Sequence, residues 1–281
     1  MNYSLIDVRP KSGSVGAEIF GIDLNKEITE EQFSEVKSAF RQFGVIFFRD
    51  QKLTPDKEIK FAEKWGKINI NRFFTHVEGY PQIAMVLKEP DQQKNIGGAW
   101  HTDHTYDAEP AMGSILFAHE VPSKGGDTMF ASMYSAYENL SEGLKKTLNK
   151  MQARHSSRHV FGEARAAKND DTVGRIRNPE AANQDTVHPV VITHPETGRK
   201  ALYVNPTFTL GFQGWTNDES KPLLDYLYNH STKPEFTCRF EWQAGSIAFW
   251  DNRATWHLAI NDYHGEKRLM HRITINGTKL N

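Results

Sequence analysis

The 281-residue sequence predicts a mainly β fold, in which an antiparallel β core is flanked by helices and carries helical insertions. Short apolar or alternating runs separated by turn signals recur through residues 114–276, and two helix patterns flank one strand near the N-terminus. A hydrophobic content of 38% and an aromatic content of 11% can build a sizeable core. No repeat or linker divides the sequence, so we expect one domain over residues 1–281.

The first elements are a helix over residues 29–43 and a strand over residues 45–48. Thr29 and Gln32 form a capping box, and Gly44 supplies a stop signal. The apolar residues of this segment recur on one helix face: Phe33, Val36, Phe40 and Phe43.

A second helix begins at Thr54-Pro55 and is expected to end at Gly66. Further helices are expected over 141–151 and 217–229. The apolar or alternating runs that predict strands cover residues 114–121, 189–193, 201–204, 246–250 and 268–276. The charged stretch 156–184 has little periodicity and is expected to be a long loop or lid that controls substrate entry.

Composition and charge exclude several classes of protein. The sequence has 34 Lys+Arg against 35 Asp+Glu, so no basic excess indicates nucleic-acid binding. The single cysteine, Cys238, cannot form an internal disulfide. The N-terminus lacks a secretory signal pattern, and the apolar runs are far shorter than the roughly 20 residues of a membrane-spanning helix. We therefore expect a cytoplasmic protein without membrane or nucleic-acid partners.

The segment 97–107 is the most informative for chemistry. If it is extended, His101 and Asp103 project to the same face. An imidazole and a carboxylate on one face supply two of the three ligands of a non-haem Fe(II) facial triad. By itself the spacing is weak evidence, because a solvated or hydrogen-bonded pair is the default interpretation.

A third ligand is offered by His257, which follows the predicted strand 246–250 and a polar turn. The alternative is a histidine tethered by Asp251 or Asn252, and taken alone it is about as plausible.

Two arginines, Arg268 and Arg272, share one face of the last predicted strand, whose other face is largely apolar. Buried guanidinium groups require an anionic partner, and a dicarboxylate such as 2-oxoglutarate would fill that role. The alternative is an edge strand with a solvated arginine face. The Thr128 hydroxyl, after the turn at Gly125-Gly126, could donate to the carboxylate that Arg268 binds; alone, this motif is only a turn.

Together these residues resemble the taurine dioxygenase family of Fe(II)- and 2-oxoglutarate-dependent oxygenases, which also includes phenoxyalkanoate herbicide dioxygenases and alkylsulfatases. The similarity also takes in residues 16–19 and 49–51, so it covers nearly the whole sequence. The matching motifs are Trp100-His101-Thr102-Asp103, Gly125-Gly126-Asp127-Thr128, His188-Pro189-Val190-Val191 and Trp250-Asp251-Asn252-Arg253, followed by His257, Arg268 and Arg272.

The resemblance implies a double-stranded β-helix, or jelly-roll and cupin-like, core with helical insertions. It implies that His101, Asp103 and His257 are the iron ligands. Arg268 and Thr128 would hold the distal carboxylate of 2-oxoglutarate, and relatives commonly form dimers or tetramers, so we expect a homo-oligomer.

On the substrate side, the resemblance implies that Arg272 meets an acidic group of the primary substrate. Asn69 and Gly97 occupy the positions of polar contacts in the taurine enzyme but do not reproduce them, so taurine is not the expected substrate. Tyr106 and Phe208 match pocket-lining positions and would pack an apolar part of the substrate; ordinary core packing is the alternative.

The implied reaction uses O₂ and converts 2-oxoglutarate to succinate and CO₂ while a small organic acid is hydroxylated. A sulfonate, sulfate ester or aryloxy acid would then lose its C–S or C–O bond. Asp103 occupies the position that halogenases leave open for halide, which disfavours halogenation. The alternatives are a biosynthetic hydroxylase or desaturase of an amino-acid-like metabolite, a non-catalytic metal-binding jelly roll, and a zinc hydrolase.

Overall fold

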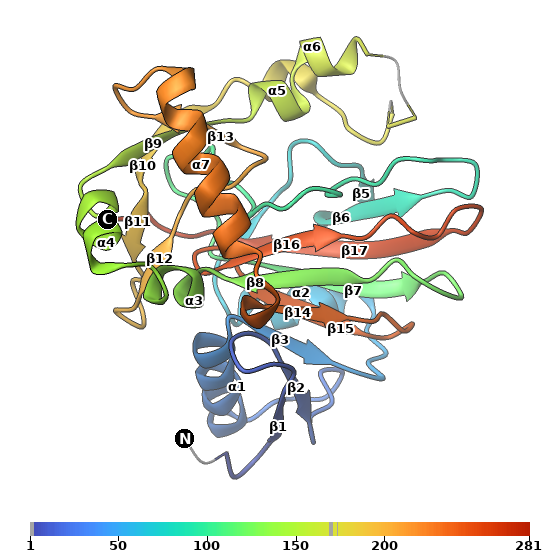
Figure 1. Ribbon diagram of the computed structural model, residues 1–281. Coiled ribbons are helices and arrows are strands. Elements are labelled where there is room, and N and C mark those ends of the chain that lie inside the picture. Colours follow the sequence, from blue (N-terminus) through green and yellow to red (C-terminus); the bar gives the residue numbers. More distant parts are fainter. Residues whose placement is uncertain (1–2, 169–170, 173) are drawn as a thin grey trace.

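The computed structural model describes residues 3–168, 171–172 and 174–281. In these ranges the central feature is a large sheet with a smaller sheet beside it (Figure 1). The large sheet has the order β1-β2-β3-β15-β7-β17-β6-β5, with β4 also paired to β17, and the small sheet has the order β14-β8-β16. Neighbouring strands are antiparallel apart from β2 and β3.

The strands of the large sheet are β1 (Asp7–Pro10), β2 (Ala17–Phe20), β3 (Val45–Phe48), β4 (Ile68–Asn69), β5 (His76–Val77), β6 (Tyr80–Lys88), β7 (Gly113–Glu120), β15 (Ile247–Asp251) and β17 (Arg268–Ile275). Those of the small sheet are β8 (Thr128–Ser132), β14 (Thr237–Phe240) and β16 (Thr255–Ala259). Two further sheets pair β10 (Asp185–Pro189), β9 (Gln152–Ser156) and β13 (Thr209–Phe212), and β11 (Val191–Thr193) with β12 (Lys200–Leu202).

The helices are α1 (Glu30–Phe43), α2 (Pro55–Glu63), α3 (Met133–Glu138), α4 (Glu142–Leu148), α5 (Arg158–Phe161), α6 (Glu163–Ala166) and α7 (Asn217–Ser231), with short 3₁₀ turns η1 (Pro179–Ala181) and η2 (Pro234–Phe236). The capping box predicted at Thr29 is present, and Gly44 ends α1 in the left-handed conformation with φ 71°. Helix α2 ends at Glu63, three residues before the predicted stop.

Aromatic side chains fill the space between the two central sheets. Phe47 of β3 stacks on Phe240 of β14, with ring centroids 4.0 Å apart, and Phe130 of β8 lies 5.7 Å from Trp250 of β15. The opposite face of the large sheet is covered by α1 and α2, and Phe40 of α1 stacks on Phe249 at 4.3 Å. These two layers bury the central strands of the large sheet, β3, β15, β7 and β17, on both faces.

Part of the predicted loop over residues 156–184 is helical. It contains α5, α6 and η1, so the expectation of an unbroken loop is wrong; residues 169–170 and 173 lie outside the described ranges. Helices α5 and α6 lie together at the top of the molecule in Figure 1. Each covers only about one turn, which explains why no helical periodicity marks them in the sequence. Nowhere in the described ranges is a helix both long and apolar enough to cross a membrane.

Candidate active site

A cavity of about 240 Å³ opens between the sheets and the segment that carries α5 and α6. Its charged and metal-ligating lining residues are His101, Asp103, His104, His257, Arg165, Arg268 and Arg272. Apolar side chains make much of the remaining lining: Phe74, Val86, Ile96, Tyr106, Leu116, Val160, Phe161, Ile176, Phe208 and Trp250. Polar groups gathered in a mainly apolar cavity are typical of a small-molecule site.

His101, Asp103 and His257 come together in this cavity as a group able to hold a metal ion. One donor atom from each lies within 4.8 Å of the other two, and all three residues are buried. Nε2 of His101 is 3.7 Å from Oδ1 of Asp103, and Nε2 of His257 is 3.8 Å from its Oδ2. Two imidazoles and one carboxylate that leave other positions open form the ligand set of non-haem Fe(II) oxygenases.

Backbone pairing places the two histidines side by side. His257 lies on β16, and its backbone N–H donates to His101 O at 2.7 Å, while His101 N–H donates to His257 O at 3.1 Å. After this bridge the chain turns, and His104 adopts a left-handed conformation with φ 60°. The extended conformation, under which His101 and Asp103 would project to the same face, therefore ends at His101. Asp103 still reaches the histidines, because the turn brings its carboxylate back toward β16.

Hydrogen bonding fixes which nitrogen His101 offers to a metal. Its Nδ1–H donates to the Ala99 carbonyl at 2.8 Å, which leaves the lone pair of Nε2 directed at the other ligands. Burial lowers the pKa of His101, and the nearby Asp103 carboxylate offsets only part of that effect. Burial and the neighbouring His101 hold the pKa of His257 well below its ordinary value. Both rings are therefore neutral, as metal ligation requires.

Asp103 is held in the ionised form. Burial alone would raise its pKa, but the charge of the neighbouring Arg272 guanidinium holds that pKa well below its usual range. Nη2 of Arg272 lies 2.6 Å from Oδ2 of Asp103, and the Ser114 hydroxyl donates to the same oxygen at 3.0 Å. Arg272 thus contacts the metal-ligating carboxylate as well as the cavity.

Arg268 is a buried cation that lacks an anionic partner among the described residues. Its side chain is buried in the cavity wall, its Nε and Nη2 have no hydrogen-bond partner, and no ion pair joins it to another of the described residues. Thr128 Oγ1 accepts from Trp242 Nε1 at 3.0 Å, so the threonine proton remains available to donate into the cavity. A buried cation without a counter-ion is costly, and a carboxylate would satisfy both groups.

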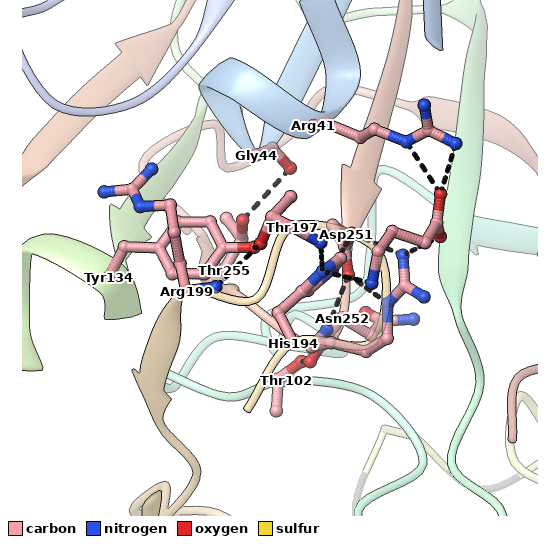
Figure 2. Close-up of polar contacts among 12 residues, drawn as sticks. Arg41, Gly44, Thr102, Tyr134, His194, Thr197, Arg199, Asp251, Asn252 and Thr255 are labelled. Carbon is pink, nitrogen blue, oxygen red and sulfur yellow. Dashed lines mark hydrogen bonds and ion pairs between the residues drawn. The ribbon is translucent and has the colours of Figure 1, made fainter. Parts of the chain in front are cut away.

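A buried charge network supports the turn between β15 and β16 (Figure 2). Asp251 accepts from Arg253 Nη2 at 2.7 Å and from His194 Nε2 at 2.9 Å. Glu196 then links Arg253, at 2.8 Å, to Arg41 of α1, also at 2.8 Å. Burial would raise the pKa of Asp251, but Arg253 and His194 keep it well below the ordinary value. The network holds in place the turn that leads directly to the strand of His257.

The same turn supports the other two triad residues. The Thr102 hydroxyl, between His101 and Asp103 in sequence, donates to the Asn252 carbonyl at 2.7 Å. Asn252 Nδ2 donates to Ser114 Oγ at 3.2 Å, and Ser114 in turn donates to Asp103. No sequence motif identified Ser114, which stands 11 residues after Asp103 and reads in the sequence only as the first residue of the predicted strand 114–121.

The remaining predicted substrate residues separate into two groups. Tyr106, Phe208 and Gly97 line the cavity. Gly97 has φ 81°, and a Cβ there would lie 3.3 Å from His101 Cε1, so a larger residue would strain the loop beside the triad. Asn69 does not line the cavity; it lies on β4 and its Nδ2 donates to Asn276 Oδ1 at 2.8 Å. Asn71, two residues later, occupies the cavity wall instead.

Comparison with known proteins gives consistent results. The family model described as taurine catabolism dioxygenase TauD, TfdA family matches residues 7–274. An alkylsulfatase from Acinetobacter baylyi is 36% identical, over 97% of this chain and 85% of that protein. An alpha-ketoglutarate-dependent sulfate ester dioxygenase from Pseudomonas putida is 32% identical, over 97% and 90%. The crystal structure of a taurine dioxygenase from Burkholderia xenovorans has a TM-score of 0.82 at 34% identity, over 98% and 92%.

Proposed function

The chain belongs to the taurine catabolism dioxygenase TauD, TfdA family, and from that premise we propose that it is an Fe(II)- and 2-oxoglutarate-dependent dioxygenase of sulfate esters or related organic anions. The observation that carries the proposal is the placement of the His101, Asp103 and His257 triad in one cavity with Arg268, a buried cation without an ion-pair partner among the described residues. A zinc hydrolase or a non-catalytic metal-binding module would not require a buried cation beside the metal ligands.

His101, Asp103 and His257 hold the iron, because they offer two neutral imidazoles and one ionised carboxylate. Bound Fe(II) supplies the oxidation in which 2-oxoglutarate and O₂ yield succinate, CO₂ and a hydroxylated substrate. The protein's contribution is to orient both organic molecules and to exclude water from the buried triad.

Arg268 and Thr128 hold the distal carboxylate of 2-oxoglutarate. Arg268 offers its unpartnered Nε–H and Nη2–H groups, and Thr128 offers its hydroxyl proton. Both residues line the same cavity as the triad, so a dicarboxylate bound to them can direct its keto-acid end toward the metal site.

The primary substrate combines an anionic group with an apolar body. Arg272 retains an Nε–H without a partner and lines the cavity, so it can receive a sulfate or sulfonate. Tyr106 and Phe208, with ring centroids 4.9 Å apart, offer an apolar surface for the rest of the molecule. Hydroxylation of the carbon that bears a sulfate ester gives an adduct that loses sulfate and leaves an aldehyde.

An anaerobic titration of metal-free protein with Fe(II) and 2-oxoglutarate tests the proposal. We expect the visible metal-to-ligand charge-transfer band of a chelated keto acid in the wild type and not in His101→Ala. Loss of the band in Arg268→Ala at low but not at high 2-oxoglutarate would assign the cosubstrate site. Bound iron without any such band would overturn the cosubstrate assignment and favour a hydrolase or binding module.

Once the band is established, succinate release in air identifies the substrate class. Medium-chain alkyl sulfates, alkyl sulfonates, aryloxy acids and amino acids form the panel. We expect alkyl sulfates to couple succinate release to formation of sulfate and aldehyde. Coupling to amino acids alone would replace the sulfate-ester proposal with a biosynthetic hydroxylase or desaturase.

A further inference from the structure

A second group of metal-ligating side chains lies on the outer face of the large sheet. Glu58 of α2, His119 of β7 and His271 of β17 each place one donor atom within 4.8 Å of the other two. His271 follows Met270, whose side chain lies in the core between the sheets, and precedes Arg272, which faces the active-site cavity. Strand alternation therefore directs the His271 side chain away from the active site.

A β-bulge aims His119 into this group. Leu269 pairs with Glu120 and Met270 pairs with Ala118, so His119 is the extra residue of β7. Its ring packs edge-on against Phe117 at 4.6 Å and lies 3.7 Å from the ring of His271, centroid to centroid. Bulges reorient single side chains in this way, often at functional sites.

The distances from the Glu58 oxygen to the two histidine nitrogens match those between neighbouring donor atoms of a tetrahedral metal site. Oε1 of Glu58 lies 3.0 Å from Nδ1 of His271 and 3.5 Å from Nε2 of His119. Zinc–ligand bonds of 2.0–2.1 Å place neighbouring donor atoms about 3.3 Å apart in a tetrahedron. Two imidazoles and one carboxylate are the donor types of Zn(II) sites that keep a fourth position open.

Without a metal, this group leaves one buried nitrogen unsatisfied. Nε2 of His119 is buried and has no hydrogen-bond partner among the described residues, while Glu58 Oε1 already accepts from His271 at 3.0 Å. A buried nitrogen without a partner lowers the free energy of unfolding unless a metal ion binds its lone pair or an acceptor binds its proton. The side chain of His119 is 29% exposed, against 5% for Glu58 and 10% for His271, so His119 is the member of the group nearest to solvent.

From these contacts we infer that Glu58, His119 and His271 form a second metal site, which binds a divalent transition metal of the zinc class. The ion joins the first turn of α2 to β7 and β17, and so braces from outside the strand that carries Arg268 and Arg272 on its inner face. The site does not depend on the proposed dioxygenase activity.

Metal counting tests the inference. Full-length protein stripped of metal is titrated with Zn(II) by calorimetry, and bound zinc is measured after gel filtration. We expect two equivalents in the wild type, one in His101→Ala, one in His119→Ala and none in the double variant. His264→Ala, which removes an exposed histidine outside both clusters, is the matched control and retains two equivalents.

A second outer-site variant controls for the possibility that His119→Ala loses zinc by misfolding. Glu58→Gln preserves the shape of the buried side chain but removes the negative charge that favours metal binding, and is expected to lose the same equivalent as His119→Ala. Co(II) provides an optical readout, because its visible absorption in His101→Ala reports the outer site alone and is expected to disappear in His101→Ala/His119→Ala. One equivalent in the wild type, or a second equivalent that persists in both outer-site variants, would overturn the inference.

Discussion

Two clusters of the same composition, each with two histidines and one carboxylate, lie on opposite faces of β17. The inner cluster of His101, Asp103 and His257 opens into the cavity that Arg268 and Arg272 also line. The outer cluster of Glu58, His119 and His271 packs between helix α2 and the sheet, away from that cavity. The ligand set alone therefore does not determine the chemistry. A neighbouring cation that can bind a keto acid, and room for a substrate, distinguish a catalytic site from a structural one.

The largest expected difference between the clusters is in activity. Asp103→Ala should lower kcat/KM by more than about a thousandfold, or roughly 4 kcal/mol in transition-state stabilisation, because the inner triad loses its carboxylate ligand. Glu58→Gln should remain within about twofold of the wild type, because its carboxylate contacts no residue of the cavity. Succinate release with and without the primary substrate measures both variants.

Both variants must first show wild-type circular dichroism and a cooperative melt. Full turnover in Asp103→Ala would refute the inner triad. Loss of turnover in a folded Glu58→Gln would show that the outer cluster supports catalysis through β17, and would break the distinction between a catalytic and a structural cluster.

Much of the fold could be predicted from local signals. The capping box at Thr29 and the glycine stop at Gly44 fixed α1, and the apolar run at 45–48 gave β3 with its bounds correct. β6, which pairs with β17, was missed although residues 83–87 form a continuous apolar run, because periodicity alone does not separate such a short run into strand or helix. The jelly-roll core followed from the resemblance rather than from periodicity, and the similarity to a solved taurine dioxygenase confirms it.

The site residues that belong to a recognisable sequence motif could be predicted. His101, Asp103 and His257 converge as predicted, although the chain turns after His101 instead of continuing in the extended conformation that the His-x-Asp argument assumed. The outer cluster was not predictable, because its members come from three separate elements and one of them depends on a bulge. The position of Asn69 outside the cavity has a similar cause: a two-residue strand directs it to Asn276, and Asn71 takes the cavity wall.

The next largest effect is expected in stability, and it arises in the buried charge network that supports the inner cluster. Asp251→Asn should lower the free energy of unfolding by about 3–5 kcal/mol, since it leaves the buried Arg253 without its nearest carboxylate. Asp7→Asn, in an exposed pair with Arg9, should cost less than about 1 kcal/mol. Urea unfolding measures both, and equal losses would mean that the buried network contributes nothing specific.

Arg268 and Arg272 separate the two anion roles of the inner cluster. Arg268→Ala should raise the KM for 2-oxoglutarate roughly ten- to a hundredfold, the equivalent of about 1.5–3 kcal/mol for lost hydrogen bonds to a charged group. Arg272→Ala should mainly raise the KM for the sulfate ester. Steady-state kinetics with each substrate varied in turn measures the split, and equal effects of both variants on both KM values would contradict it.

A pH-dependent effect on stability is expected from two buried histidines whose rings contact each other. His155 and His188 lie 5.5 Å apart, ring to ring, and burial together with the neighbouring His188 lowers the pKa of His155 to about 3. In the unfolded chain the pKa of histidine is about 6.5, so between these two values the unfolded state binds a proton that the folded state does not. Stability that is present above pH 6.5 should therefore fall as the pH drops toward 3.

His155→Phe removes this titration while keeping a ring of similar size in the buried position. Its free energy of unfolding should depend less on pH between pH 6 and 4 than that of the wild type, by up to about 1.4 kcal/mol per pH unit. Urea unfolding at four pH values in this range measures the difference between the slopes. Parallel slopes for wild type and His155→Phe would mean that the buried ring gains its proton as readily in the folded chain as in the unfolded one.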